Sequence, residues 1–79
     1  MTTIKRGSRG EDVKILQACL RMLQYTGSNG KPIRIDGYAG EQTIYAINSF
    51  QITQEAYGYP CGSGDGSFGA KCWARLLGV

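Results

Sequence analysis

Two stretches of this chain repeat one order of residues, and that order restricts the fold more than any other feature. Residues 36–43 read Asp-Gly-Tyr-Ala-Gly-Glu-Gln-Thr, and residues 65–72 read Asp-Gly-Ser-Phe-Gly-Ala-Lys-Cys. The glycine after each aspartate suits a turn, because glycine adopts a positive φ without steric cost and aspartate bonds to nearby backbone. The second glycine stands where an N-cap would precede a helix. The repeat therefore predicts two helices that each begin after a glycine.

A looser third copy near the start of the chain predicts a third helix. Gly10 is followed by Glu11 and Asp12, and acidic residues are favourable at the positive end of a helix dipole. An arm at residues 1–9 precedes this helix. We expect helices at about residues 11–25, 41–57 and 70–77. The two good copies are spaced almost like solenoid repeats, but neither has a second element of its own. The 79 residues are therefore predicted to form one all-α domain, a small closed three-helix bundle with glycine-rich connecting loops.

Apolar residues recur at helical spacing in the two longer helices and mark their buried faces. In the first helix these residues are Val13, Leu16, Leu20 and Leu23. In the second helix the buried stripe is Thr43, Ala46, Ile47 and Phe50. A second stripe on the first helix consists of Ile15, Cys19 and Met22. We expect this wide apolar arc to be contacted on two sides within the domain; the alternative is that part of it faces a partner.

Several single residues are expected to shape the ends of the elements and the core. Ile4 is expected to tuck the N-terminal arm against the bundle. Gly27 is expected to end the first helix in the left-handed conformation, and Gly78 is expected to close the third. Phe68 and Trp73 are predicted to belong to the core.

Composition excludes several kinds of chemistry. The chain has no histidine and three cysteines, so a Ser–His–Asp triad, a Cys–His pair and a histidine-bearing zinc site are impossible within it. No CxxC spacing indicates a metal site, and no cofactor is expected. Cys61 and Cys72 flank the last turn, and the sequence leaves open whether they form a disulfide. Cys19 is expected to be a small buried residue of a helix.

Charge and hydropathy exclude two classes of partner. The net charge is +3, without the clustered basic excess that is typical of nucleic-acid binding. No apolar run is long enough to cross a bilayer, so membrane insertion is not expected. The first residues also lack the apolar segment of a signal peptide.

Three blocks of the sequence carry a resemblance to a known family. They are Gly-Ser-Arg-Gly-Glu-Asp-Val at 7–13 with Leu16-Gln17, the 36–43 repeat with Ala-Ile at 46–47 and Phe-Gln at 50–51, and residues 65–73 with Leu-Leu-Gly at 76–78. Together, in this order, they resemble the three-helix peptidoglycan-binding domain, the PGBD-like fold. The resemblance covers nearly the whole chain. Ala39 departs from the family's usual aromatic residue and Cys72 from its usual threonine, and both loops are longer than typical.

The resemblance implies a non-catalytic module of a bacterial or phage protein. Such a module holds a covalently linked cell-wall hydrolase, such as an amidase, a peptidase or a muramidase, on its polymer substrate, peptidoglycan. It also implies an extracellular or cell-wall-associated location, reached through export of the parent protein or through phage lysis.

Peptidoglycan offers sugar rings, hydroxyl and acetamido groups, and peptide carboxylates. A surface that binds it needs aromatic faces, hydrogen-bonding groups and a cation. The candidate ligand-binding residues are Arg34, Asp36, Tyr38, Tyr57 and Tyr59. For the last two tyrosines the alternative is that they cover the edge of the core under a long loop. For Asp36 the alternative is a turn aspartate that bonds its own backbone.

Two other functions compete with wall binding. A protein-docking or structural module would use the Ile15–Met22 stripe or an outward face of the second helix, which carries Tyr45 and Ile52. A minimal glycosidase would need paired carboxylates, here Asp36 or Asp65 with Glu41. The aspartates occupy matching turns, so repetition explains them without catalysis.

Overall fold

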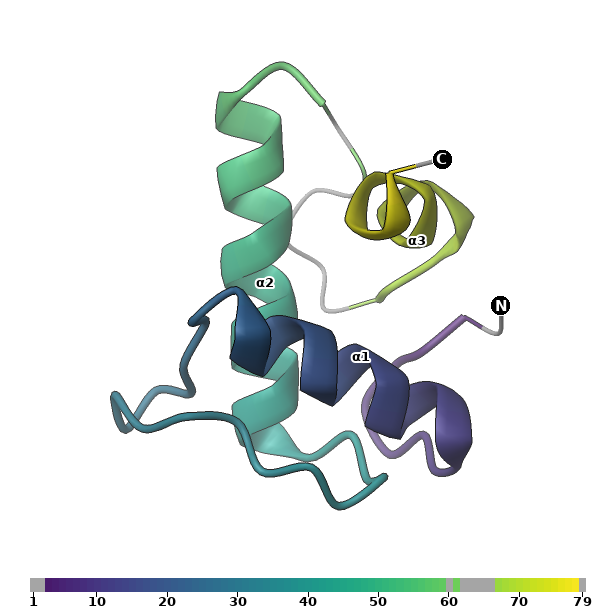
Figure 1. The fold of residues 1–79 in the computed structure, drawn as a ribbon, viewed down its shortest axis with the longest axis vertical. Coiled ribbons are helices and arrows are strands. Elements are labelled where there is room, and N and C mark those ends of the chain that lie inside the picture. Colours follow the sequence, from purple (N-terminus) through teal and green to yellow (C-terminus); the bar gives the residue numbers. More distant parts are fainter. Residues whose placement is uncertain (1–2, 60, 62–66, 79) are drawn as a thin grey trace.

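The computed structural model contains three α-helices within the residues it describes, 3–59, 61 and 67–78. They are α1 (Glu11–Met22), α2 (Glu41–Ala56) and α3 (Ala70–Leu77). Figure 1 shows α2 as the long upright helix, with α1 crossing its lower part and α3 beside its upper part. Over this described part of the chain there is no strand, only isolated antiparallel bridges. The predicted all-α, three-helix architecture is confirmed.

Each helix begins after the glycine that the repeat indicated. Gly10, Gly40 and Gly69 are the N-cap residues, and none of the three helices has a side-chain cap. Gly37, in the turn before α2, has a φ of 77°, and an added Cβ would lie 3.2 Å from the side chain of Lys14. This turn therefore needs glycine both for its backbone conformation and for its close approach to α1.

The end of α1 differs from the prediction. The helix stops at Met22, three residues before the expected end, and Gln24 adopts the left-handed conformation with a φ of 67°. The Tyr25 N–H then donates to the Leu20 carbonyl at 2.9 Å, the bond that closes a Schellman-type end. The prediction that Gly27 would stop this helix was wrong, because the stop comes earlier and in a residue with a side chain.

The other two helices end at left-handed glycines. Gly58, with a φ of 86°, follows the end of α2, and the Tyr59 N–H donates to the Gln54 carbonyl at 2.9 Å. Gly78, with a φ of 75°, follows α3 as predicted. The α2 helix stops at Ala56, one residue before the expected end.

The core contains buried residues of all three helices, of the N-terminal arm and of the segments that connect the helices. Its buried apolar residues are Ile4, Val13, Leu16, Leu20, Ile33, Ala39, Ile44, Ala46, Ile47, Phe50, Cys61, Phe68, Cys72 and Trp73. The stripe predicted on α2 is buried throughout. Tyr25, Phe50, Phe68 and Trp73 form a chain of aromatic contacts, with ring centroids 5.0–5.8 Å apart along it.

The prediction that α1 is contacted on two sides was wrong. Ile15 and Leu23 are exposed, Cys19 is half-buried and Met22 is 82% exposed. The bundle has too few elements to cover a second face of this helix. Tyr45 and Ile52 on α2 are exposed, as their outward placement predicted.

The N-terminal arm is part of the core packing. Ile4 is buried and forms an antiparallel bridge with Phe68, with N···O distances of 3.0 Å and 2.7 Å. This contact joins the start of the chain to the segment that leads into α3. None of the described helices is both long enough and apolar enough to cross a membrane.

Candidate functional site

The five candidate residues do not form one site. Arg34, Asp36 and Tyr38 lie along one hollow of about 350 Å³, which we call the turn hollow, and Tyr59 lies along another. Tyr57 is 70% exposed and lines neither hollow. The remaining residues that line the turn hollow come from the start of α2: Gly40, Glu41, Gln42 and Thr43.

A buried glutamine of α1 holds the turn that carries these residues. The Gln17 side-chain oxygen accepts hydrogen bonds from the N–H groups of Asp36 at 3.0 Å and Gly37 at 2.9 Å. Its Nε2 lies 3.0 Å from Asp36 Oδ1, 3.0 Å from the Tyr38 carbonyl and 3.1 Å from Thr43 Oγ1. Both ends of the amide are therefore engaged, and the turn is fixed against α1 and α2 at once.

The Asp36 carboxylate is part of this support. Its Oδ1 accepts from Gln17 and from the Tyr38 N–H at 3.0 Å. The hydrogen bond from Gln17, followed by the one from the Tyr38 backbone, lowers the pKa of Asp36 below its ordinary value of 3.8, and Arg34 contributes to the same shift. Asp36 thus bonds its own turn, which is the alternative that its position beside glycine suggested.

The side chain of Tyr38 is the aromatic surface of the turn hollow. It is 40% exposed, and its ring packs so close to Gly40 that an added Cβ there would lie 3.2 Å away. The guanidinium of Arg9 lies 4.5 Å from the ring centroid. Backbone bonds bring the two residues together: Ala39 donates to the Ser8 carbonyl at 2.8 Å, and Arg9 forms an antiparallel bridge with Tyr38.

A second glutamine attaches the first long loop beside the turn hollow. Gln42 Oε1 accepts from the backbone N–H and the hydroxyl of Ser28, at 2.6 Å and 3.0 Å. A Cβ on Gly27 would lie 2.2 Å from that oxygen, so Gly27 is required for this close approach. The role expected of Gly27 as a helix stop is thus replaced by one in loop attachment.

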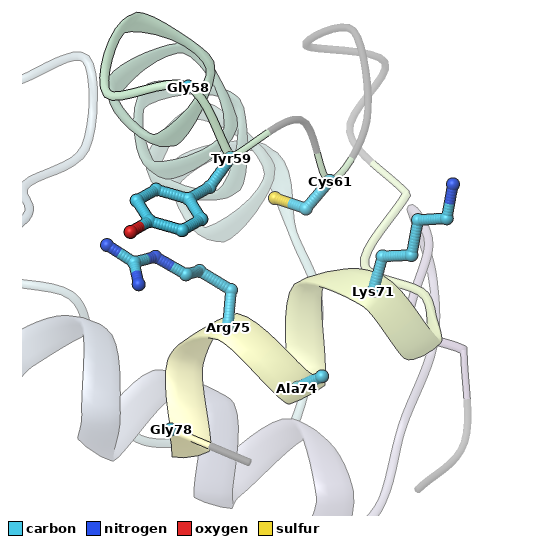
Figure 2. Close-up of a pocket in the computed structure, with 7 residues that line it drawn as sticks. All are labelled: Gly58, Tyr59, Cys61, Lys71, Ala74, Arg75 and Gly78. Atoms are coloured by element: carbon cyan, nitrogen blue, oxygen red, sulfur yellow. The ribbon is translucent and has the colours of Figure 1, made fainter.

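The other hollow, which we call the α3 hollow, has a volume of about 460 Å³. Figure 2 shows Tyr59 and Arg75 on one side of it, Lys71 on the other and Cys61 between them. The Arg75 guanidinium lies 3.7 Å from the Tyr59 ring centroid, and its Nε donates to Gln54 Oε1. The remaining residues that line it are small: Gly58, Ala74 and Gly78.

Cys19, Cys61 and Cys72 are free thiols in this structure, and Cys61 and Cys72 are not joined by a disulfide. Cys72 is buried and donates its S–H to the carbonyl of Cys61. Among the described residues no cluster of His, Cys, Asp or Glu side chains is placed to hold a metal ion. Asp65, considered with Asp36 as a carboxylate pair, lies outside the described residues.

A small three-helix fold whose turn hollow and α3 hollow are both lined by tyrosine and charged side chains fits a binding module. A sequence model of the family described as "putative peptidoglycan binding domain" matches residues 9–76, and the chain belongs to this family. The family places the chain among cell-wall binding modules, which are non-catalytic.

A solved structure supports the same assignment. The chain is similar to the N-terminal domain of SleB, known from a crystal structure, with 36% sequence identity and a TM-score of 0.69. The alignment covers 98% of this chain and 90% of that one. A search of curated proteins gave no match.

Proposed function

We propose that this chain binds peptidoglycan through the turn hollow and holds an attached cell-wall hydrolase, such as an amidase, peptidase or muramidase, against its substrate. The observation that carries the proposal is Tyr38, an accessible ring fixed by Arg9 and by the turn that Gln17 supports. The proposal places the protein outside the membrane, at a bacterial cell wall, which it reaches through export of its parent protein or through phage lysis.

The groups around Tyr38 suit a carbohydrate with amide substituents. The ring offers a flat face to the CH groups of a sugar, and Arg34 with Glu41 offers donors and acceptors for hydroxyl and acetamido groups. The start of α2 also opens onto the hollow. Its first N–H groups have no intrahelical acceptor and Gly40 supplies no side-chain cap, so they suit a carbonyl or carboxylate oxygen of the ligand.

Because the turn hollow is open, we expect one module to bind the polymer weakly. Weak binding is still useful when the module is covalently linked to a catalytic domain. Once the module is attached to the polymer, a linked catalytic domain meets its substrate at a high effective concentration. Binding of the module therefore raises the rate on an insoluble wall without any reactive group in this chain.

Co-sedimentation with purified bacterial sacculi tests the proposal. We expect the domain to pellet with sacculi, and Tyr38→Ala to weaken binding about three- to tenfold, the size of a lost aromatic contact. Tyr45→Ala is the matched control, because Tyr45 is exposed on α2 away from this hollow, and it should bind within about twofold of the unchanged protein.

Recovery of the unchanged domain in the supernatant at both low and high salt would contradict the proposed function. Equal losses for Tyr38→Ala and Tyr45→Ala would leave wall binding in place and remove the turn hollow as its site. Tyr57→Ala, measured alongside, shows whether the exposed tyrosine outside both hollows contributes.

A further inference from the structure

We propose that the α3 hollow is a second binding site, for the free carboxylate of a peptidoglycan stem peptide. This inference rests on the proposed function and names a second part of the same polymer. It is carried by the residues around the hollow, which combine a guanidinium held by two contacts, a lysine and three residues with little or no side chain.

Arg75 is held in the geometry that carboxylate recognition needs. Its guanidinium is stacked 3.7 Å from the Tyr59 centroid, and its Nε is engaged by the side chain of Gln54. A guanidinium has five N–H donors, so the terminal groups remain for a ligand after Nε is used. Because stacking and the Nε bond already restrict the side chain, less rotamer entropy is lost when a carboxylate binds.

The charge around the hollow favours an anion. Lys71 and Arg75 are one turn apart on α3, and neither forms an ion pair within the part of the chain that the structure describes. Among the residues that the structure describes, those that line the hollow include no aspartate or glutamate. An entering carboxylate therefore meets Arg75 on one side of the hollow, and Lys71 on the other side adds to the positive charge.

The size of the lining selects a small peptide end. Gly58, Ala74 and Gly78 add almost no side-chain volume, and Figure 2 shows Gly58 just past the end of α2 and the other two at α3. A small terminal residue such as alanine suits this lining, with its carboxylate toward Arg75. The Tyr59 ring then covers one side of the peptide.

Chemical-shift titration of the labelled domain with two soluble muropeptides tests this assignment. One probe ends in a free carboxylate and the other, otherwise identical, ends in a carboxamide. We expect the acid to shift the amides of Gly58, Tyr59, Arg75 and Gly78, and the amide probe to bind at least about fivefold more weakly, since one charge-assisted contact is lost. This pair of probes needs no variant, so it does not depend on how a mutant folds.

Variants then assign the effect to Arg75. Arg75→Gln should weaken binding of the acid about tenfold while leaving the weaker binding of the carboxamide within about twofold. Arg75→Lys should fall between the two, because lysine keeps the charge and loses the planar fork. Arg6→Gln, which removes the same charge from an exposed residue outside the hollow, is the control and should bind within about twofold.

Two results would overturn the inference: equal affinity for the acid and the carboxamide, or shifts confined to the turn hollow. Either leaves the proposed function standing if the domain still pellets with sacculi. If the unchanged protein does not pellet with sacculi, the proposed function itself is contradicted.

Discussion

Gln17 and Gln51 perform the same task at two places in the molecule, with different partners. Each is fully buried, and each reaches from one helix to the segment that starts the next. Gln17 donates to Thr43 Oγ1 at 3.1 Å, whereas Gln51 donates to Cys72 Sγ at 3.4 Å. Thr43 and Cys72 stand at the same position of the glycine-led repeat, so the comparison isolates oxygen against sulfur.

The difference shows that the same buried glutamine can reach either an oxygen or a sulfur in the helix that follows. Sulfur is a weaker hydrogen-bond acceptor than a hydroxyl oxygen. Cys72 compensates in part by donating its own S–H to the Cys61 carbonyl, which ties α3 to the residue at the edge of the α3 hollow. Gln17 holds two consecutive backbone N–H groups and a carboxylate in the turn beside the turn hollow.

The largest effect on stability is expected when the side-chain amide of Gln17 or of Gln51 is removed, each in a separate variant. Gln17→Leu should lower the free energy of unfolding by about 3 kcal/mol or more, because it leaves several buried polar groups of the turn without partners. Gln51→Leu should cost about 2 kcal/mol, because its partners include a sulfur. Urea unfolding followed by circular dichroism measures both. A larger loss of unfolding free energy for Gln51→Leu than for Gln17→Leu would contradict the view that Gln17 supports more of the structure.

A smaller effect is expected from the Asp36 carboxylate, which accepts hydrogen bonds in the first turn. The pKa of Asp36 is lowered in the folded protein, so its contribution to stability is complete above the ordinary value of 3.8 and is lost as the pH falls through the folded value. The stability of the unchanged protein relative to Asp36→Asn should therefore shrink between about pH 5 and pH 2. Urea midpoints of both proteins at several pH values provide the measurement. A difference that stays constant over this range would show that ionised Asp36 does not support the turn.

The smallest effect is expected where the two positions are made alike. Cys72→Thr places a hydroxyl of similar size against Gln51, and that hydroxyl can also donate to the Cys61 carbonyl. We expect stability to change by less than about 1 kcal/mol, in the stabilising direction. Cys72→Val has the same shape as the threonine variant but can form neither hydrogen bond. It should therefore be clearly less stable than Cys72→Thr when both are compared by thermal unfolding. Equal stability of the threonine and valine variants would show that hydrogen bonding by Cys72 contributes nothing.

The sequence predicted those features that depend on neighbouring residues. The glycines before the helices, the stripe from Thr43 to Phe50 and the burial of Trp73 all follow from local conformation and periodicity, and the structure confirms them. The exposure of Leu23 and Met22 was not predicted, because periodicity shows where apolar residues lie but not how many faces the fold can cover. The left-handed Gln24 gave no signal, because glycine is the usual residue in that conformation.

The candidate site was predictable only where its residues are close in sequence. Arg34, Asp36 and Tyr38 share one hollow because they alternate along one segment, and their contact with a ligand stays a prediction. The contact of Arg9 with Tyr38 and that of Arg75 with Tyr59 join distant parts of the chain, so the spacing of residues in the sequence does not predict them. One signal for the supporting residues was available: glutamine follows a core residue in Leu16-Gln17 and again in Phe50-Gln51, and a repeated polar residue on a buried face indicates a structural hydrogen bond.

The bridge between Ile4 and Phe68 decides where this module can be cut for transplantation into another protein. The match to the family begins at residue 9, so a graft trimmed to that boundary would lack a side chain that fills the interior. It would also leave the Phe68 backbone without its antiparallel partner next to the lead-in to α3. A fusion designed from this chain should therefore place its junction upstream of Ile4.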